Sequence, residues 1–217
     1  MDGIIHIVSP LSASWCGWVM LGLLLCAVLS EWLQPGVITQ APASLLASTD
    51  RTYKESPTTF WGQFFISLFR IGTLAMVLNM SLSMDGVFSF ARYGVVCALV
   101  VGMFLVKMIC NISIDYTFML SRRFGDMYEH YGNIMTLAVL VLYPVALVLM
   151  RIGNPVIGQW VLGIVAGLFV AMWIYRSARA YVTSPLAVVY LALYIGTVEI
   201  LPCGVLYFLS AKLVTII

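Results

Sequence analysis

The chain has 217 residues, of which 62% are hydrophobic and only 9% are charged, and its formal net charge is +2. Soluble domains contain roughly 45–50% apolar and about 25% charged residues, so this composition excludes a water-soluble fold. The sequence contains no basic patch with interleaved aromatic residues, so we expect the lipid bilayer as a partner and no nucleic acid. At about 20 residues per span, the length allows roughly six transmembrane helices.

In chain order, the first apolar run forms an N-terminal unit, residues 1–30. It is uncharged from Ile7 to Ser30, which exceeds the apolar core of a signal peptide, so we expect a retained transmembrane helix. A linker rich in Pro, Ser and Thr follows over residues 31–59. Five further spans are predicted within a bundle over residues 60–217, at about 60–83, 93–114, 134–150, 155–175 and 185–211.

These apolar runs are continuous and do not alternate with polar residues, which favours membrane-spanning helices over a β-barrel. The predicted fold class is therefore an all-α integral membrane bundle of about six transmembrane helices. Lys and Arg residues are twice as frequent on one set of connections as on the other side, which predicts that both termini are periplasmic. The cationic connections carry Arg51, Lys54, Arg122, Arg123, Arg176 and Arg179, against Arg92, Arg151 and Lys212 opposite.

Two ionisable residues lie deep inside predicted spans. Arg70 lies about ten residues into the second span and Glu199 about fourteen residues into the last. At 1.5 Å per residue their depths are about 15 and 21 Å, a difference that an arginine side chain can bridge. An ionised residue at the bilayer centre costs roughly 2.5–3.5 kcal/mol unless it has a partner. We therefore predict an Arg70–Glu199 ion pair near the middle of the membrane.

Pro202 follows Glu199 by three residues and removes the backbone hydrogen bond to the carbonyl of Val198. This predicts a kink in the last span and a free carbonyl beside the carboxylate. Arg70, Glu199 and Pro202 together form what we call the intramembrane node. The interpretation that we favour is a structural charge pair that fixes helix register, and the alternatives are a proton or ion relay, a ligand headgroup, or the charge of a partner subunit.

Charged and aromatic residues interleave over residues 115–131, which predicts an amphipathic segment at the cytoplasmic membrane surface, accessible for docking. Its charged residues are Arg122, Arg123, Asp126, Glu129 and His130. The spacing of Asp126, Glu129 and His130 suits metal ligation, yet no second acidic or histidine cluster is present to complete a site. We therefore predict no metal, and the five cysteines, which form no CxxC pair, support this expectation.

Gly163 and Gly167 form a GxxxG pair in the fifth predicted span, a pattern that permits close helix contact. The sequence contains no GxSxG, HExxH, paired-histidine haem pattern or Gly-rich phosphate loop. We therefore expect no enzyme activity and no cofactor.

The stretch LYIGTVEILPCGVLY (193–207) resembles the C-terminal signature of an uncharacterised Bacteroidota family of integral membrane proteins. That signature reads roughly Leu-Tyr-Leu-Cys-x-x-Glu-Ile-x-Pro, and the chain departs from it at the Leu-Cys positions. The matching residues are Leu193, Tyr194, Glu199, Ile200 and Pro202, and Lys107, Phe124–Asn133 and Pro144 keep the family's order upstream. The resemblance covers about residues 93–211, implies a Gram-negative inner membrane and assigns no substrate; the helical pattern is loosely similar to Yip-type bundles.

The first functional hypothesis is a non-enzymatic inner-membrane subunit or scaffold of a larger envelope complex for secretion, motility or biogenesis, with other membrane protein subunits as partners. The alternative is a small proton- or ion-coupled transporter that uses Glu199 and Arg70. A third hypothesis is a lipid-modifying enzyme that uses Asp126, Glu129 and His130.

Overall fold

The computed structural model describes residues 14–39, 59–82, 89–118, 121–152, 154–181, 196 and 201–216. These residues form helices, as the apolar runs predict, and the all-helical fold class is confirmed. The six helices of the described part are α1 (Ser14–Leu33), α3 (Phe60–Leu82), α4 (Phe90–Phe118), α5 (Ser121–Ile152), α6 (Pro155–Tyr181) and α8 (Leu201–Ile216).

Four of the described helices contain apolar stretches long enough to cross a membrane, which confirms a multi-pass membrane protein. These stretches are Trp15–Leu33, Phe60–Leu82, Phe90–Cys110 and Gly132–Ile152. The apolar part of α6 is shorter, Val156–Met172, and α8 has 16 residues. The structure therefore supports four long spans in its described part, where the sequence pattern predicts six.

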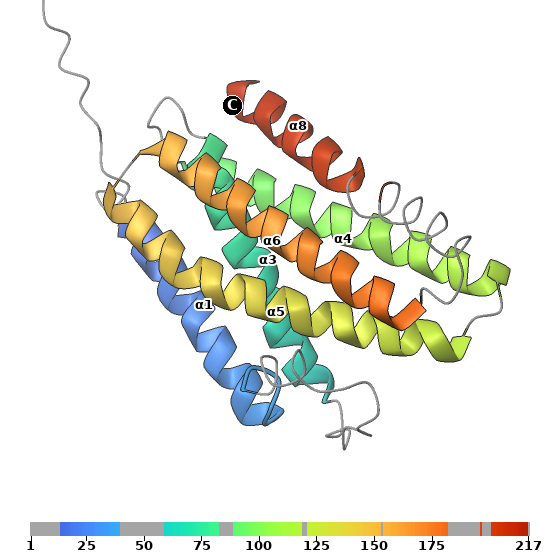
Figure 1. Ribbon diagram of the computed structural model, residues 1–217. Helices are drawn as coiled ribbons and strands as arrows, with labels where there is room; N and C mark the ends of the chain where they lie inside the picture. The colour runs from blue at the N-terminus through green and yellow to red at the C-terminus, as the bar shows by residue number, and fades with distance from the viewer. Residues whose placement is uncertain are drawn as a thin grey trace, which may run out of the picture.

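Helix α3 lies at the centre of the bundle and contacts α1, α4, α5, α6 and α8. Figure 1 shows it crossing behind α5 and α6, with α1 alongside it. From Gly72 to Leu82 every residue except Leu74 is buried, and the apolar core is built around this stretch, including Met76 and Val77. In a bilayer, close van der Waals packing and interhelical hydrogen bonds hold this central helix in place.

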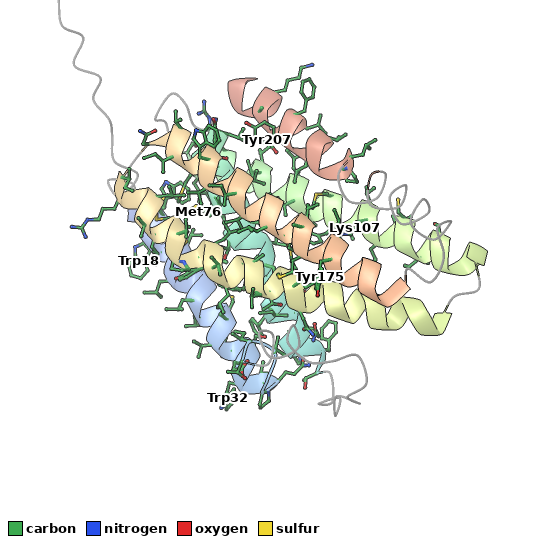
Figure 2. All side chains as sticks on the ribbon, in the orientation of Figure 1. Trp18, Trp32, Met76, Lys107, Tyr175 and Tyr207 are labelled. Carbon is green, nitrogen blue, oxygen red and sulfur yellow. The ribbon has the colours of Figure 1, made fainter. Side chains whose placement is uncertain are left out.

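The outward faces of the surrounding helices are apolar, as expected of surfaces in contact with lipid. On α1, Trp18 and Trp32 are 73% and 77% exposed, and Figure 2 shows both on the outer side of the helix. On α6, Trp160 and Leu168 are similarly exposed. In water these faces would favour aggregation, whereas in a bilayer they are solvated by acyl chains.

Helix α1 is closed by a turn that one carboxylate organises. Glu31 accepts hydrogen bonds from the backbone N–H of Gly36 (2.9 Å) and Ile38 (2.7 Å), and from the hydroxyl of Thr39 (2.9 Å). Gly36 has φ 105°, in the left-handed region where a side chain is strained. The chain therefore leaves α1 in a fixed direction at the start of the predicted linker 31–59, of which residues 40–58 lie outside the described part.

Several helix ends lie at one end of the bundle. Figure 1 shows the start of α1, the end of α3, the starts of α4 and α6 and the end of α8 together there. The ring of Trp15 on α1 contacts the rings of Phe90 and Tyr93 on α4, with centroid distances of 5.6 and 5.8 Å. The first described helix thus begins, and the last one ends, at the same end of the bundle.

Candidate functional site

Arg70 is half-buried between α3 and α5. Its Nε donates a hydrogen bond to Oγ1 of Thr136 at 3.0 Å, and its Nη2 donates to the same oxygen. The hydroxyl of Thr136 in turn donates to the carbonyl of Gly132, one turn earlier on α5, at 2.8 Å. The Thr136 hydroxyl thus accepts hydrogen bonds from the Arg70 cation on α3 while it donates one to the backbone of α5, and the first of these contacts links the two helices.

Gly132 provides the space beside the guanidinium. A Cβ at this position would lie 3.8 Å from both terminal nitrogens of Arg70, which is ordinary van der Waals contact. The guanidinium therefore lies beside the small residue at the start of the apolar segment Gly132–Ile152. Along α3, Arg70 lies ten residues, or about 15 Å, from Phe60. Its acceptor Thr136 lies only four residues, or about 6 Å, from Gly132, the first residue of the apolar segment of α5.

The remaining members of the predicted node are less fully described. Glu199 lies outside the described residues, so the predicted Arg70–Glu199 pair stays a prediction. Pro202 is the second residue of α8 and is half-buried. A proline in the first turn of a helix removes no intrahelical hydrogen bond within that helix, because the first N–H groups have no partner there.

The predicted docking segment 115–131 belongs to two long helices. Residues 115–118 are the end of α4, and residues 121–131 are the first three turns of α5, which continues without a break to Ile152. The positions of Arg122, Arg123, Asp126, Glu129 and His130 all fall on this part of α5, but their side chains lie outside the described set. Among the described residues no group of three or more His, Cys, Asp or Glu residues can hold a metal ion.

Gly163 and Gly167 lie on an exposed face of α6. A Cβ at either position would meet nothing within 4 Å. The pair therefore packs against no other helix among the described residues of this chain. Its neighbours on the same face, Trp160, Ile164 and Leu168, are also exposed.

Polar side chains join the other helices, and sequence reasoning did not single out most of them. Four of their hydrogen bonds run from a side chain of one helix to a backbone carbonyl of another, and the fifth runs from Gln63 to the side chain of Gln34, the residue that follows α1. They are Ser30 to Gly62 O (3.0 Å), Gln63 to Gln34 Oε1 (3.2 Å), Tyr93 to Gly72 O (3.3 Å), Tyr143 to Met20 O (2.9 Å) and Gln159 to Ser81 O (2.9 Å). The one sequence signal for the α5 contact is the small-xxx-small spacing of Gly132 and Thr136.

Comparison with known proteins gives a family and no activity. The model of one protein family, described as a domain of unknown function (DUF4271), matches residues 17–209. No curated protein and no solved structure matches the chain.

Proposed function

Since the chain belongs to the DUF4271 family, whose description assigns no activity, we propose a function from the use of its polar groups. We propose that the protein is a non-enzymatic subunit or scaffold of a larger envelope complex in the bacterial inner membrane. One observation carries the proposal: side chains such as those of Ser30, Tyr143 and Gln159 donate hydrogen bonds to backbone carbonyls of neighbouring helices. Groups used in this way fix the arrangement of the helices.

The exposed face of α6 supports the same proposal. Gly163 and Gly167 allow the backbone of another helix to approach closely, and no described helix of this chain uses that surface. We propose that α6 and α8 cross the membrane with the four long spans, and that both termini are periplasmic. The common end of the bundle at which α1 begins and α8 ends supports an even number of crossings.

The experiment is purification of the tagged protein at native expression in a mild detergent, followed by composition and mass analysis. We expect stoichiometric partner subunits with the wild type and their loss with the double variant Gly163→Ile and Gly167→Ile. That variant should accumulate normally, because both positions face open space. The matched control is Gly94→Ile and Gly102→Ile on α4, which also face open space and should retain the partners. A clean monomer or homo-oligomer for the wild type would contradict the proposal.

A second candidate function, a small proton- or ion-coupled transporter that uses Glu199 and Arg70, is favoured by the cations inside the spans. Arg70 and Lys107 both lie within candidate spans, and Lys107 is only 7% exposed. Charged residues inside transmembrane segments commonly mark ion pathways. In reconstituted vesicles this candidate predicts that Glu199→Gln abolishes solute-driven or proton-driven flux while the abundance of the protein is unchanged. Equal loss of flux and abundance would favour the scaffold.

A further inference from the structure

The outward face of α1 carries a tryptophan at each end and aliphatic side chains between them. Trp18 and Trp32 are 73% and 77% exposed, and Figure 2 shows both on the outer side of the helix. The side chains between them are also exposed and follow at alternating intervals of three and four residues, namely Leu21, Leu25 and Val28. Residues at these intervals lie on one face of a helix, so the five side chains form a single stripe, which we call the α1 stripe.

A third tryptophan, Trp61 of α3, lies close to the level of Trp32. The side-chain amide of Gln63 donates a hydrogen bond to Oε1 of Gln34 at 3.2 Å, and each glutamine lies two positions from one of the two tryptophans. The backbones of Trp32 and Trp61 therefore lie within about 6 Å of one another in depth. Trp61 is 57% exposed, and its ring contacts that of Phe60, which is 74% exposed, with ring centroids 5.6 Å apart.

The composition of the α1 stripe matches lipid and not a second protein surface. Helix contacts in membranes favour small residues that let backbones approach, whereas Leu, Val and Trp are bulky. The two exposed glycines of α1, Gly17 and Gly22, are five residues apart, so they do not lie one above the other as residues i and i+4 do. Tryptophan has an apolar ring with one N–H donor and is enriched where hydrocarbon meets the headgroups. Tryptophans at both ends of an aliphatic stripe therefore match the two surfaces of a bilayer.

The polar turn after α1 assigns one end of the stripe to the membrane surface independently. The carboxylate of Glu31, next to Trp32, accepts an exposed hydrogen bond of 2.9 Å from the hydroxyl of Thr39. An ionised carboxylate is costly in hydrocarbon and is stable beside headgroups and water. Trp32 therefore lies where the apolar stretch of α1 meets polar surroundings.

The packing of α1 against α3 converts these levels into a depth for Arg70. Gly72 of α3 lies against the side chain of Leu23 of α1, and Arg70 precedes Gly72 by two residues. The two helices run in opposite directions (Figure 1), so the level of Arg70 is that of Leu25, two residues after Leu23. Leu25 lies seven residues, or about 10 Å, from each tryptophan of the α1 stripe.

We propose that the α1 stripe and Trp61 anchor the protein in the bilayer at a fixed depth. The headgroup boundary is the partner of the tryptophans, with Trp32 and Trp61 at one surface and Trp18 at the other, and acyl chains are the partner of the aliphatic residues between them. The backbones of Trp18 and Trp32 are about 21 Å apart, against about 30 Å for the hydrocarbon core, so the indoles extend toward the headgroups as flanking side chains do at short spans.

The anchor holds Arg70 near the middle of the hydrocarbon region. It does not depend on the scaffold role, because that role places the partner subunits on α6 and the anchor uses the outward face of α1. Failure of one therefore leaves the other in place.

Single-tryptophan variants of the full chain test the anchor in phosphatidylcholine vesicles whose acyl chains carry bromine either near the headgroup or near the methyl end. The other tryptophans are replaced by Phe, and the readout is the ratio of shallow to deep fluorescence quenching. We expect a ratio above one for Trp18, Trp32 and Trp61. The matched control is Leu25→Trp in the background without other tryptophans, and we expect a ratio below one because this exposed position lies midway along the stripe. Equal ratios at Trp32 and Leu25→Trp, or no quenching of either, would overturn the anchor.

A photo-crosslinking amino acid at Leu25 tests the same surface in a chain that keeps all its tryptophans, and so decides the matter where a single-tryptophan variant does not accumulate. We expect crosslinks to lipid and none to protein. A protein crosslinked at Leu25 in stoichiometric amount would overturn the anchor. The same probe at Leu168 on α6 tests the scaffold role separately. Lipid at both positions would support the anchor and contradict the scaffold, whereas lipid at Leu25 with a subunit at Leu168 would support both.

Discussion

The two halves of α3 are held in the bundle by different means. In the second half, Gly72–Leu82, nearly every residue is buried, and neighbouring helices reach its backbone directly. In the first half, Phe60–Phe69, only three residues are buried, namely Gly62, Ile66 and Phe69. There the aromatic residues Phe60 and Trp61 are 74% and 57% exposed. One helix thus passes from a partly lipid-facing surface into a densely packed core.

Arg70 lies at the boundary between these halves. A guanidinium needs hydrogen-bond acceptors and some access to polar surroundings, which the packed half could provide only at a high desolvation cost. At the boundary it reaches Thr136 and Gly132, near the start of the apolar segment of α5. Along α3, this contact of a charged side chain therefore lies where packing is incomplete, and the packed half is joined to α4 and α6 by neutral hydrogen bonds from Tyr93 and Gln159.

The largest effect is expected at Gly62, in the first half of α3, against which the residue after α1 packs closely. A Cβ there would lie 2.7 Å from Cβ of Gln34, the residue that follows α1, and this atom moves only with its backbone. We expect Gly62→Ala to separate the helices, weaken the 3.0 Å hydrogen bond from Ser30, and cost about 2–3 kcal/mol, a fall in Tm of roughly 4–12 °C. Thermal unfolding in detergent measures this change.

The control for this prediction is Gly94→Ala on α4, where a Cβ would meet nothing within 4 Å. Alanine has the higher helix propensity, so this variant should be neutral or more stable by up to about 1 kcal/mol. If Gly62→Ala and Gly94→Ala are equally stable, the close contact at Gly62 can open without loss of stability. Close packing would then not stabilise the first half of α3.

The sequence predicts the helices better than it predicts their contacts. The second span, expected at 60–83, is α3 at Phe60–Leu82, because a long apolar run satisfies its backbone only as a helix in lipid. The polar residues 121–131 read as a separate connector, yet they continue α5, because a helix satisfies its own backbone whatever its side chains are. The approach of Gln34 to Gly62 leaves no pattern in the sequence, since it depends on how two helices cross.

The same limit applies at the candidate site. The position of Arg70 inside a span follows from the sequence, because a single charge stands out in an apolar run. Its acceptor Thr136 does not follow, because threonine is common in membrane helices and the contact depends on the crossing of α3 and α5. The hydroxyl is thus a testable addition to the node.

An intermediate effect is expected for Thr136→Val, which keeps the shape of the side chain and removes the hydroxyl. Arg70 then loses an acceptor, and we expect a loss of about 1–2 kcal/mol, since hydrogen bonds to charged groups are the stronger class. Chemical or thermal unfolding in detergent measures the loss. Thr136→Ser keeps the hydroxyl and should remain close to the wild type. If serine is as destabilising as valine, the methyl group and not the hydrogen bond supports the contact.

The smallest effect is expected in the packed half, at the hydrogen bond from Gln159 of α6 to the carbonyl of Ser81, 2.9 Å long. Interhelical hydrogen bonds in membrane proteins contribute about 0.6 kcal/mol on average, so Gln159→Leu should lower Tm by only about 1–3 °C. Gly158 beside it lies at ordinary contact distance from Ser81, with a Cβ position 3.6 Å from Cα of that residue, so the helices are held by packing as well. If Gln159→Leu lowers the free energy of unfolding more than Thr136→Val does, the comparison is reversed. The packed half of α3 would then depend more on its hydrogen bond from Gln159 than the boundary depends on the contact between Arg70 and Thr136.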